Sequence, residues 1–279
     1  MQLYDEIGIG YASLRRPDPR IAARIFQALG EAETVVNVGA GAGSYEPLDR
    51  HVMAVEPSLT MIHQRPRGSA PVVRASATQL PFKDAAFPAA LAVLTVHHWP
   101  DRARGLCELA RVARDRVVVV TWDPAFSGFW LIDDYFPAII ELDRRLFPTA
   151  EEFRRALGRF TIRPLLIPHD CTDGFLGAYW RRPHAYLKRE VRNAISAFAK
   201  IAGVEEGLTR LAQDLADGTW QRRHGHLLQQ VELDLGYRLV VSGEAIPAGR
   251  AAVGLCEQRE EFGPGSDHMI RLHGSGTLG

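Results

Sequence analysis

The chain has 279 residues, of which 46% are hydrophobic and 24% charged, and its 33 basic side chains equal its 33 acidic ones. This composition excludes a disordered or fibrous chain, and the balanced charge leaves no basic surface for nucleic acid. No apolar run approaches the length of a membrane span, the first residues lack a signal-peptide pattern, and the three cysteines form no disulfide or metal-binding motif, so we expect a soluble, cytoplasmic protein without a metal or a membrane partner.

Strand and helix patterns alternate through the first half of the chain. A helical face over residues 21–29 ends at Gly30, and a buried strand over 35–38 runs into a glycine cluster. Further strands are predicted at residues 52–55, 71–74, 91–96 and 117–122, with an amphipathic helix over 106–113. This alternation predicts βαβ units, and therefore a doubly wound α/β fold whose parallel sheet is covered by helices on both faces.

After residue 123 the pattern changes to large apolar side chains and helical faces. Helical faces are predicted within 191–202 and 208–215, a sixth strand within 161–168 and a returning strand within 237–242.

The domain organisation follows from these segments. We expect an N-terminal helical segment over residues 1–34 and one domain over 35–243. Within that domain, residues 125–160 and 170–234 are predicted to be cap insertions over one edge of the sheet. Residues 244–279 are rich in glycine and charge and lack periodicity, which predicts a flexible tail.

A glycine-rich turn follows the first predicted strand. Gly39, Gly41 and Gly43 lie in the segment VVNVGAGAGSYE, where glycines permit a sharp turn and let a ligand approach the main chain. Glu56 ends the next strand, and a carboxylate there can accept hydrogen bonds from two vicinal ribose hydroxyls. Such a turn can also be packed for its own sake, but its place between a strand and Glu56 favours a nucleotide-like ligand.

The spacing of the glycines discriminates between nucleotide ligands. The dinucleotide fingerprint needs a third glycine where this chain has Ser44. The pattern G-x-G-x-G instead resembles motif I of the class I S-adenosylmethionine-dependent methyltransferases. HVMAVEPSLTMI resembles the second strand of that family, and ASATQLPFKDAAFPAALAVLTVHHWPD resembles the run through the fourth strand in small-molecule methyltransferases of the ubiquinone-biosynthesis type. The resemblance covers roughly residues 1–125.

The resemblance implies a Rossmann-like, mostly parallel seven-stranded sheet with a helical cap. It also implies S-adenosylmethionine as the cofactor, with S-adenosylhomocysteine as its product. Tyr11 would cover the methionine moiety, and Arg15 or Arg16 would pair with its carboxylate unless the arginines are simply solvated. The predicted cofactor-binding residues are Tyr11, Arg16, Asn37, Gly39, Ala40, Gly41, Gly43, Glu56, Pro57, Met61, Ser76, Ala77 and Thr95.

Two positions depart from the family pattern. Asn37 stands where the family usually carries an acidic residue, and Ser76 stands where it often carries an aspartate that accepts from the adenine amine. An amide oxygen and a hydroxyl can still accept hydrogen bonds, but they bring no charge.

The HHWPD segment at the end of the fourth predicted strand carries the candidate catalytic residues. It resembles the HDW segment of plant-type O-methyltransferases, whose first histidine is the general base, and that alignment lands on His97. An imidazole with an ordinary pKa suits the deprotonation of a phenol or alcohol, whereas a carboxylate acceptor needs no base. We therefore predict His97 as the base and His98 as a second candidate; the alternative is that both only pack the crevice.

The acceptor side is marked by aromatic residues in and near the predicted cap insertions. The predicted substrate-binding residues are Trp99, Trp122, Trp130, Tyr135, Tyr179 and Arg181. The alternative for several of them is packing within the core of the cap.

Together these features predict a methyltransferase that acts on a small molecule by in-line displacement, with O-methylation favoured. One alternative keeps the cofactor but uses it for non-methyl chemistry such as an intramolecular cyclisation. An NAD-dependent oxidoreductase would rest on the glycine turn alone, and a vestigial cofactor-binding module would rest on Asn37 and Ser76.

Overall fold

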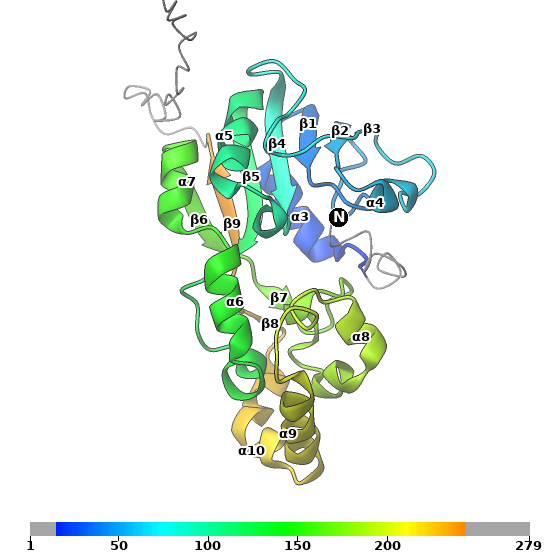
Figure 1. Cartoon of the computed structure of the whole chain (residues 1–279), viewed down its shortest axis with the longest axis vertical. Helices are drawn as coiled ribbons and strands as arrows, with labels where there is room; N and C mark the ends of the chain where they lie inside the picture. The colour runs from blue at the N-terminus through cyan, green and yellow to red at the C-terminus, as the bar shows by residue number, and fades with distance from the viewer. Residues whose placement is uncertain (1–14, 244–279) are drawn as a thin grey trace, which may run out of the picture.

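The computed structural model describes residues 15–243 of the chain, with a large sheet in the upper part of Figure 1 and a lobe of short helices in the lower part. The predicted tail over 244–279 and Tyr11 lie outside the described residues. None of the helices within residues 15–243 has the length and apolar character needed to cross a membrane.

The large sheet has seven strands. They are β1 (Thr34–Val38), β2 (His51–Val55), β3 (Val72–Val73), β4 (Phe87–Val93), β5 (Ala113–Trp122), β6 (Phe160–Pro164) and β9 (Tyr237–Ser242). Their spatial order is β3-β2-β1-β4-β5-β9-β6, with β1 to β5 parallel and β9 antiparallel to both of its neighbours. This confirms the predicted Rossmann-like, mostly parallel seven-stranded sheet. The strand order reverses between β1 and β4, which is where ligands bind in such sheets.

Alternate residues of β5 show how the sheet is covered on both faces. Val117 and Val119 belong to a core that includes the buried residues of helix α5 (Arg102–Val112). Val118 and Val120 point to the opposite core, which includes helix α3 (Pro19–Ala28). Because successive side chains of a strand point to opposite faces, a continuous β-branched run is the pattern expected of a strand buried on both sides.

Local signals in the sequence set several helix boundaries. Asp18 caps α3 by accepting from the Arg20 amide, and Asp101 caps α5 in the same way. The remaining helices are α4 (Leu59–His63), α6 (Ala138–Leu146), α7 (Ala150–Leu157), α8 (Arg189–Asn193), α9 (Val204–Ala216) and α10 (Thr219–His224).

Residues 165–236 form the helical lobe, which lies between β6 and β9 in the chain. Besides α8 to α10 it holds the short two-stranded sheet of β7 (Ile167–Pro168) and β8 (Glu232–Leu233). Its interior belongs to the same hydrophobic core as α3, because Trp180 and Leu211, both fully buried, pack in one cluster with Ile25.

Three of the predicted elements need correction. The strand expected at 91–96 runs from Phe87 to Val93, because Leu94 adopts a positive φ of 48° and the chain then forms a helical turn, η1 (Val96–His98). The helical face expected within 191–202 is only partly helical: α8 ends at Asn193 and turns follow it, although Ile195 and Phe198 remain buried. The strand expected within 161–168 is divided into β6 and β7.

Candidate functional site

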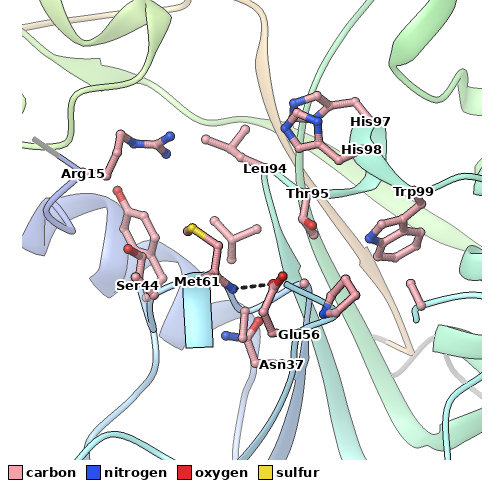
Figure 2. Close-up of a pocket in the computed structure, with 18 of the residues that line it drawn as sticks. Arg15, Asn37, Ser44, Glu56, Met61, Leu94, Thr95, His97, His98 and Trp99 are labelled. Atoms are coloured by element: carbon pink, nitrogen blue, oxygen red, sulfur yellow. Dashed lines mark hydrogen bonds between the residues drawn. The ribbon is translucent and has the colours of Figure 1, made fainter. Parts of the chain in front are cut away.

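A cavity of about 600 Å³ lies at the carboxyl ends of β1, β2 and β4. We call it the main cavity (Figure 2). Around it are the glycine turn, the end of β2, the loop before β4 and the turn after β4, in the order of the chain. Its lining residues include eleven of the predicted site residues: Asn37, Gly39, Ala40, Gly41, Glu56, Pro57, Met61, Ser76, Ala77, Thr95 and Trp99, together with His97 and His98. A cavity of this size is in the range of small-molecule and cofactor sites.

The glycine turn presents main chain, not side chains, to the main cavity. The amides of Gly39 and Ala40 both donate to the carbonyl of Val55, at 2.8 and 3.0 Å, and so hold the turn against the end of β2. Gly39 has a φ of +72°, and a Cβ on it would lie 2.0 Å from Oγ1 of Thr95. Only glycine allows both this backbone conformation and the close approach of β4.

Glu56 is held in a fixed orientation beside this turn. Its Oε2 accepts from the Gly41 amide at 2.8 Å, drawn as the dashed line in Figure 2, and its Oε1 accepts from the Ser58 amide at 2.9 Å. The residue is only 7% exposed. An ionised carboxylate has about four lone-pair positions, so these two amides leave it able to accept from a ligand's hydroxyl groups as well.

A second carboxylate lies next to Asn37, the position where the related family usually carries an acid. The amide nitrogen of Asn37 donates to Oε1 of Glu46 at 3.3 Å, and Glu46 forms a buried ion pair with Arg65 at 2.8 Å. Arg65 also donates to the carbonyl of Gly41 at 3.3 Å, so the pair supports the glycine turn from behind. The sequence analysis missed Glu46 and Arg65. A carboxylate three residues after Gly43 was the available signal for the first, and nothing local marked the second.

The far wall of the main cavity is formed by Trp99 and Ser76. The hydroxyl of Ser76 lies 2.9 Å from that of Thr78 and accepts from the Thr78 amide at 3.3 Å. Trp99 packs flat against α5, where a Cβ on Gly105 would lie 2.4 Å from its ring. Its indole N–H is buried without a hydrogen-bond partner, which is an uncommon state for a buried donor in a cavity wall.

His97 and His98 lie above Thr95 in Figure 2, on the helical turn η1. Their ring centroids are 3.8 Å apart, and the His97 ring also stacks on Phe147 at 4.2 Å. Nδ1 of His97 has no hydrogen-bond partner.

Both histidines are held in their neutral form. Burial is the main cause that lowers the pKa of each ring, and the positive charges of Lys200 and Arg15 lower it further. The pKa of His98 falls to about 3, and that of His97 lies well below its ordinary value. A neutral imidazole has a ring nitrogen that can accept a proton, but the lowered pKa also makes each ring a weaker base than an ordinary histidine, so base catalysis here needs the bound acceptor to be held against the ring.

Arg15 reaches the main cavity from the N-terminal side, as Figure 2 shows. Its Nε donates to Oδ1 of Asp173 at 2.6 Å, and the hydroxyl of Tyr45 donates to Oδ2 of the same carboxylate at 2.9 Å. Asp173, in the helical lobe, is 1% exposed. Arg16, by contrast, is exposed and lines neither cavity.

A second cavity, of about 80 Å³, continues from the main cavity toward the helical lobe. We call it the inner chamber. Residues that line both cavities form the passage between them: Arg15, Leu94, His97, His98, Leu146 and Lys200. Its deeper wall contains Asp143 and the aromatic residues Trp122, Phe147, Phe175 and Tyr237.

The predicted substrate-binding residues divide between these cavities and the core. Trp99 lines the main cavity and Trp122 the inner chamber. Four others line neither cavity: Trp130, Tyr135, Tyr179 and Arg181. Trp130 is buried with its N–H on the Trp180 carbonyl at 2.9 Å, Tyr135 donates to Asp214 at 2.7 Å, Tyr179 lies under the guanidinium of Arg182, and Arg181 donates to the Gln230 carbonyl.

Gly43, which the sequence places among the cofactor-binding residues, also lines neither cavity. A Cβ on it would face the guanidinium of Arg65 at 3.3 Å. Glycine at this position therefore leaves room for the Arg65 side chain, which pairs with Glu46 on the side of the turn away from the cavity.

Comparison with known proteins identifies the family to which the chain belongs. Residues 36–121 match the model of a methyltransferase domain. A solved structure of a putative methyltransferase from an antibiotic biosynthesis pathway of Anabaena variabilis is 33% identical, and the match covers 82% of this chain and 98% of that one with a TM-score of 0.75.

Two further solved structures are more distant. Geranyl diphosphate C-methyltransferase of Streptomyces coelicolor, solved with S-adenosylhomocysteine, is 17% identical over 79% of this chain and 76% of its own, with a TM-score of 0.44. The [4+2]-cyclase SpnF is 14% identical over 88% and 94%, with a TM-score of 0.49.

Proposed function

Since the chain belongs to the class I S-adenosylmethionine-dependent methyltransferases and uses S-adenosylmethionine as its cofactor, we propose that it methylates a small-molecule acceptor, with oxygen as the favoured nucleophile. The observation that carries this proposal is the pair of neutral histidines in the passage between the main cavity and the inner chamber. Because both rings line both cavities, an acceptor group in the inner chamber and a cofactor in the main cavity would meet beside them.

The residues of the main cavity fit the cofactor. Glycine at position 39 leaves the main chain open to a ligand, and Glu56 offers a fixed, buried carboxylate for ribose hydroxyls. We assign the adenine to the surroundings of Met61 and Ser76, and the carboxylate of the methionine moiety to Arg15, whose guanidinium suits a carboxylate.

His97 is the proposed general base. Bound S-adenosylmethionine supplies an activated methyl group, so the protein has mainly to orient the acceptor and take up its proton. His97 has an unpartnered ring nitrogen, and stacking on Phe147 fixes the plane of its ring. His98 is the second candidate, because it shares the same passage.

The helical lobe is the proposed cap over the acceptor. Lys200, from the segment between α8 and α9, lines both cavities, so this lobe forms part of the wall that an acceptor would meet.

Calorimetric titration with S-adenosylhomocysteine, and separately with NADH, is the first test of the site. We expect micromolar binding of the former and none of the latter. Glu56→Gln should weaken S-adenosylhomocysteine binding at least about tenfold, since it loses charge-assisted hydrogen bonds. Unchanged affinity in this variant would contradict the assignment of Glu56.

A mass-spectrometric screen of phenols, alcohols, carboxylates and amines tests the reaction. We expect a mass gain of one methyl group together with S-adenosylhomocysteine. Release of methylthioadenosine would instead identify non-methyl chemistry. His97→Ala should lower turnover of a phenol or alcohol about 10²-fold or more while S-adenosylhomocysteine affinity stays the same. Unchanged turnover in that variant would remove His97 as the base.

A further inference from the structure

Two oppositely charged side chains face the inner chamber without pairing. Asp143, on α6, is 6% exposed, and its carboxyl group has no hydrogen bond or ion pair with any residue of 15–243. Lys200 comes from the segment between α8 and α9 and is half-buried. No ion pair within 4.0 Å joins the two groups, so each remains available to a third partner.

Burial makes this arrangement costly in the absence of a ligand. It raises the pKa of Asp143 to about 7, against the opposing effect of the Lys200 charge, and it lowers the pKa of Lys200, against the opposing effect of Asp143. Removing a charged group from water without a close partner is unfavourable, and buried charges in proteins are normally paired. A ligand that completes both interactions would relieve this cost.

Most of the other polar groups of the chamber already have roles, and the hydroxyl of Ser196, which also lines it, carries no charge. Arg15 is engaged by Asp173, and the Tyr237 hydroxyl accepts from the Gly177 amide at 3.0 Å. The two histidines are neutral. Of the chamber residues, Asp143 and Lys200 therefore define the polarity that a bound group would meet.

The rest of the chamber is apolar and small. Phe147, Phe175 and Ile195 line it, and its volume of about 80 Å³ has room for a head group of a few heavy atoms but not for a whole acceptor. The remainder of the acceptor would have to extend through the passage beside His97 into the main cavity.

We propose that the inner chamber binds a zwitterionic head group of the acceptor, such as that of an α-amino acid, with its ammonium on Asp143 and its carboxylate on Lys200. An acceptor with only an ammonium would also face the positive charge of Lys200, and an acceptor with only a carboxylate would face Asp143. A group that carries both charges satisfies both side chains at once. This inference rests on the proposed function, since it names the acceptor class for the same site.

The test uses the full chain saturated with S-adenosylhomocysteine and three matched probes, measured by calorimetry. L-tyrosine carries both charges, tyramine lacks the carboxylate, and desaminotyrosine lacks the amine. We expect L-tyrosine to bind at least about tenfold more tightly than either analogue, because each loses one charge-assisted interaction. Equal or weaker binding of L-tyrosine, or no binding of any probe at millimolar concentration, would overturn the proposal.

Two variants locate the interaction. In Asp143→Asn the advantage of L-tyrosine over desaminotyrosine should disappear, and in Lys200→Met its advantage over tyramine should disappear. Asp143→Asn tests the ammonium of the head group and Lys200→Met tests its carboxylate. Lys200→Met therefore remains decisive if Asp143→Asn does not fold. Retention of both advantages in a folded variant would place the head group elsewhere and overturn the proposal.

Failure of the proposed function gives a different result. Loss of S-adenosylhomocysteine binding by the unaltered chain would contradict the cofactor site. The expected order of probe affinities without a methylated product from any zwitterionic acceptor would support the chamber and contradict methyl transfer. Rapid methylation of acceptors that lack a zwitterion, with no preference for those that carry one, would contradict the chamber and leave methyl transfer intact.

Discussion

At the scale of single residues, the site depends on burial to set protonation. The rings of His97 and His98 are shielded from water by each other, by Phe147 and by the passage walls, so the charged imidazolium is disfavoured. Both rings are therefore unprotonated across the physiological range, where an exposed histidine would be partly protonated, but burial also lowers their affinity for a proton.

This state predicts the pH profile of turnover. If His97 is the base, turnover at saturating acceptor, where binding by Asp143 no longer limits the rate, should stay level from about pH 7.5 to about pH 5.5, the range in which an ordinary histidine would become protonated. Steady-state rates in mixed buffers of constant ionic strength would measure this. An acid limb centred near pH 6.5 that disappears in His97→Ala would contradict the neutral, buried state of this ring.

Asp143 predicts a pH-dependent change in stability. Its pKa is about 7 in the folded protein against an ordinary 3.8, so the folded state holds the proton more tightly, and stability falls as pH rises through this interval. Asp143→Asn cannot ionise and should therefore be more stable than the unaltered chain at pH 8, by at most about 4 kcal/mol, and by a smaller margin of about 1–2 kcal/mol at pH 5.

Urea unfolding at the two pH values measures this difference. Asp170→Asn is the matched control, because Asp170 is exposed and its pKa is lowered, not raised, by Arg20. A stabilisation of Asp143→Asn that is the same at both pH values would contradict the buried, unpaired carboxyl group.

At the scale of elements, two contacts connect segments that are distant in the chain. The carboxylate of Asp173 joins the helical lobe to Arg15 in the N-terminal segment and to Tyr45 after the glycine turn. The contact of Gly39 with Thr95 joins that turn to the end of β4.

Asp173→Asn should destabilise the protein and weaken cofactor binding together. It removes the buried negative charge that Arg15 and Tyr45 bind, a change that costs about 3–5 kcal/mol in comparable buried pairs. Asp170→Asn breaks an exposed pair with Arg20 and should cost less than about 1 kcal/mol. Unfolding curves and S-adenosylhomocysteine affinity measure both effects, and equal behaviour of the two variants would show that Asp173 does not connect these segments.

Gly39→Ala tests the second contact, with Gly68→Ala as its control. Both glycines have a positive φ, but a Cβ on Gly68 meets nothing within 4 Å, whereas one on Gly39 would collide with Thr95. Gly68→Ala should therefore cost only backbone strain, about 1 kcal/mol, and Gly39→Ala should cost more and abolish S-adenosylhomocysteine binding. Similar stability and binding in both variants would mean that Thr95 moves aside without consequence.

The elements that the sequence predicts well are those with local signals. β1, the glycine turn and Glu56 follow one another within a short stretch, so pattern and spacing suffice to bring them together. Residues of the helical lobe were harder to interpret, because helical periodicity at Ile195 and Phe198 reflects burial against other elements and not a continuous helix.

The aromatic residues also show that local sequence does not tell a core position from a cavity wall. A tryptophan in a core and a tryptophan in a cavity wall have the same local pattern, which is why the sequence assigned the same role to Trp122, which lines the inner chamber, and to Trp130, which packs in the core. Asp143 and Lys200 had no sequence signal at all, because their placement in one chamber arises only when α6 and the segment after α8 pack together.

At the scale of the whole molecule, one hydrophobic core runs through the sheet and the helical lobe. Ile25 of α3, Val118 of β5 and Leu211 of α9 all belong to it, and each is fully buried. The lobe therefore shares its main stabilising interactions with the sheet, and independent unfolding is not expected.

A comparison of two probes tests this cooperativity. Trp99 and Trp122 report on the sheet and its cavities, Trp180 and Trp220 lie in the lobe, and Trp130 packs against these two, so tryptophan fluorescence samples both parts. Thermal unfolding by fluorescence and by far-ultraviolet circular dichroism should coincide. S-adenosylhomocysteine at 100 times its dissociation constant should stabilise both transitions equally, by about 2.7 kcal/mol. An earlier fluorescence transition that the ligand does not shift would indicate separate unfolding of the lobe.

The way in which the chain enters and leaves the helical lobe has an evolutionary consequence. Pro164 at the end of β6 pairs with Arg238 of β9, and the amide of Leu165 donates to the carbonyl of Tyr237 at 2.9 Å, so the lobe begins and ends at adjacent positions on neighbouring strands. A segment with joined ends can be exchanged between relatives while the strand pairing of the sheet is kept, provided that the new segment supplies the contacts that Asp173 and the shared core make. Recombination at these two positions offers a route by which a lineage acquires new acceptors while it inherits an old cofactor site, and the same two positions are natural junctions for chimeric enzymes.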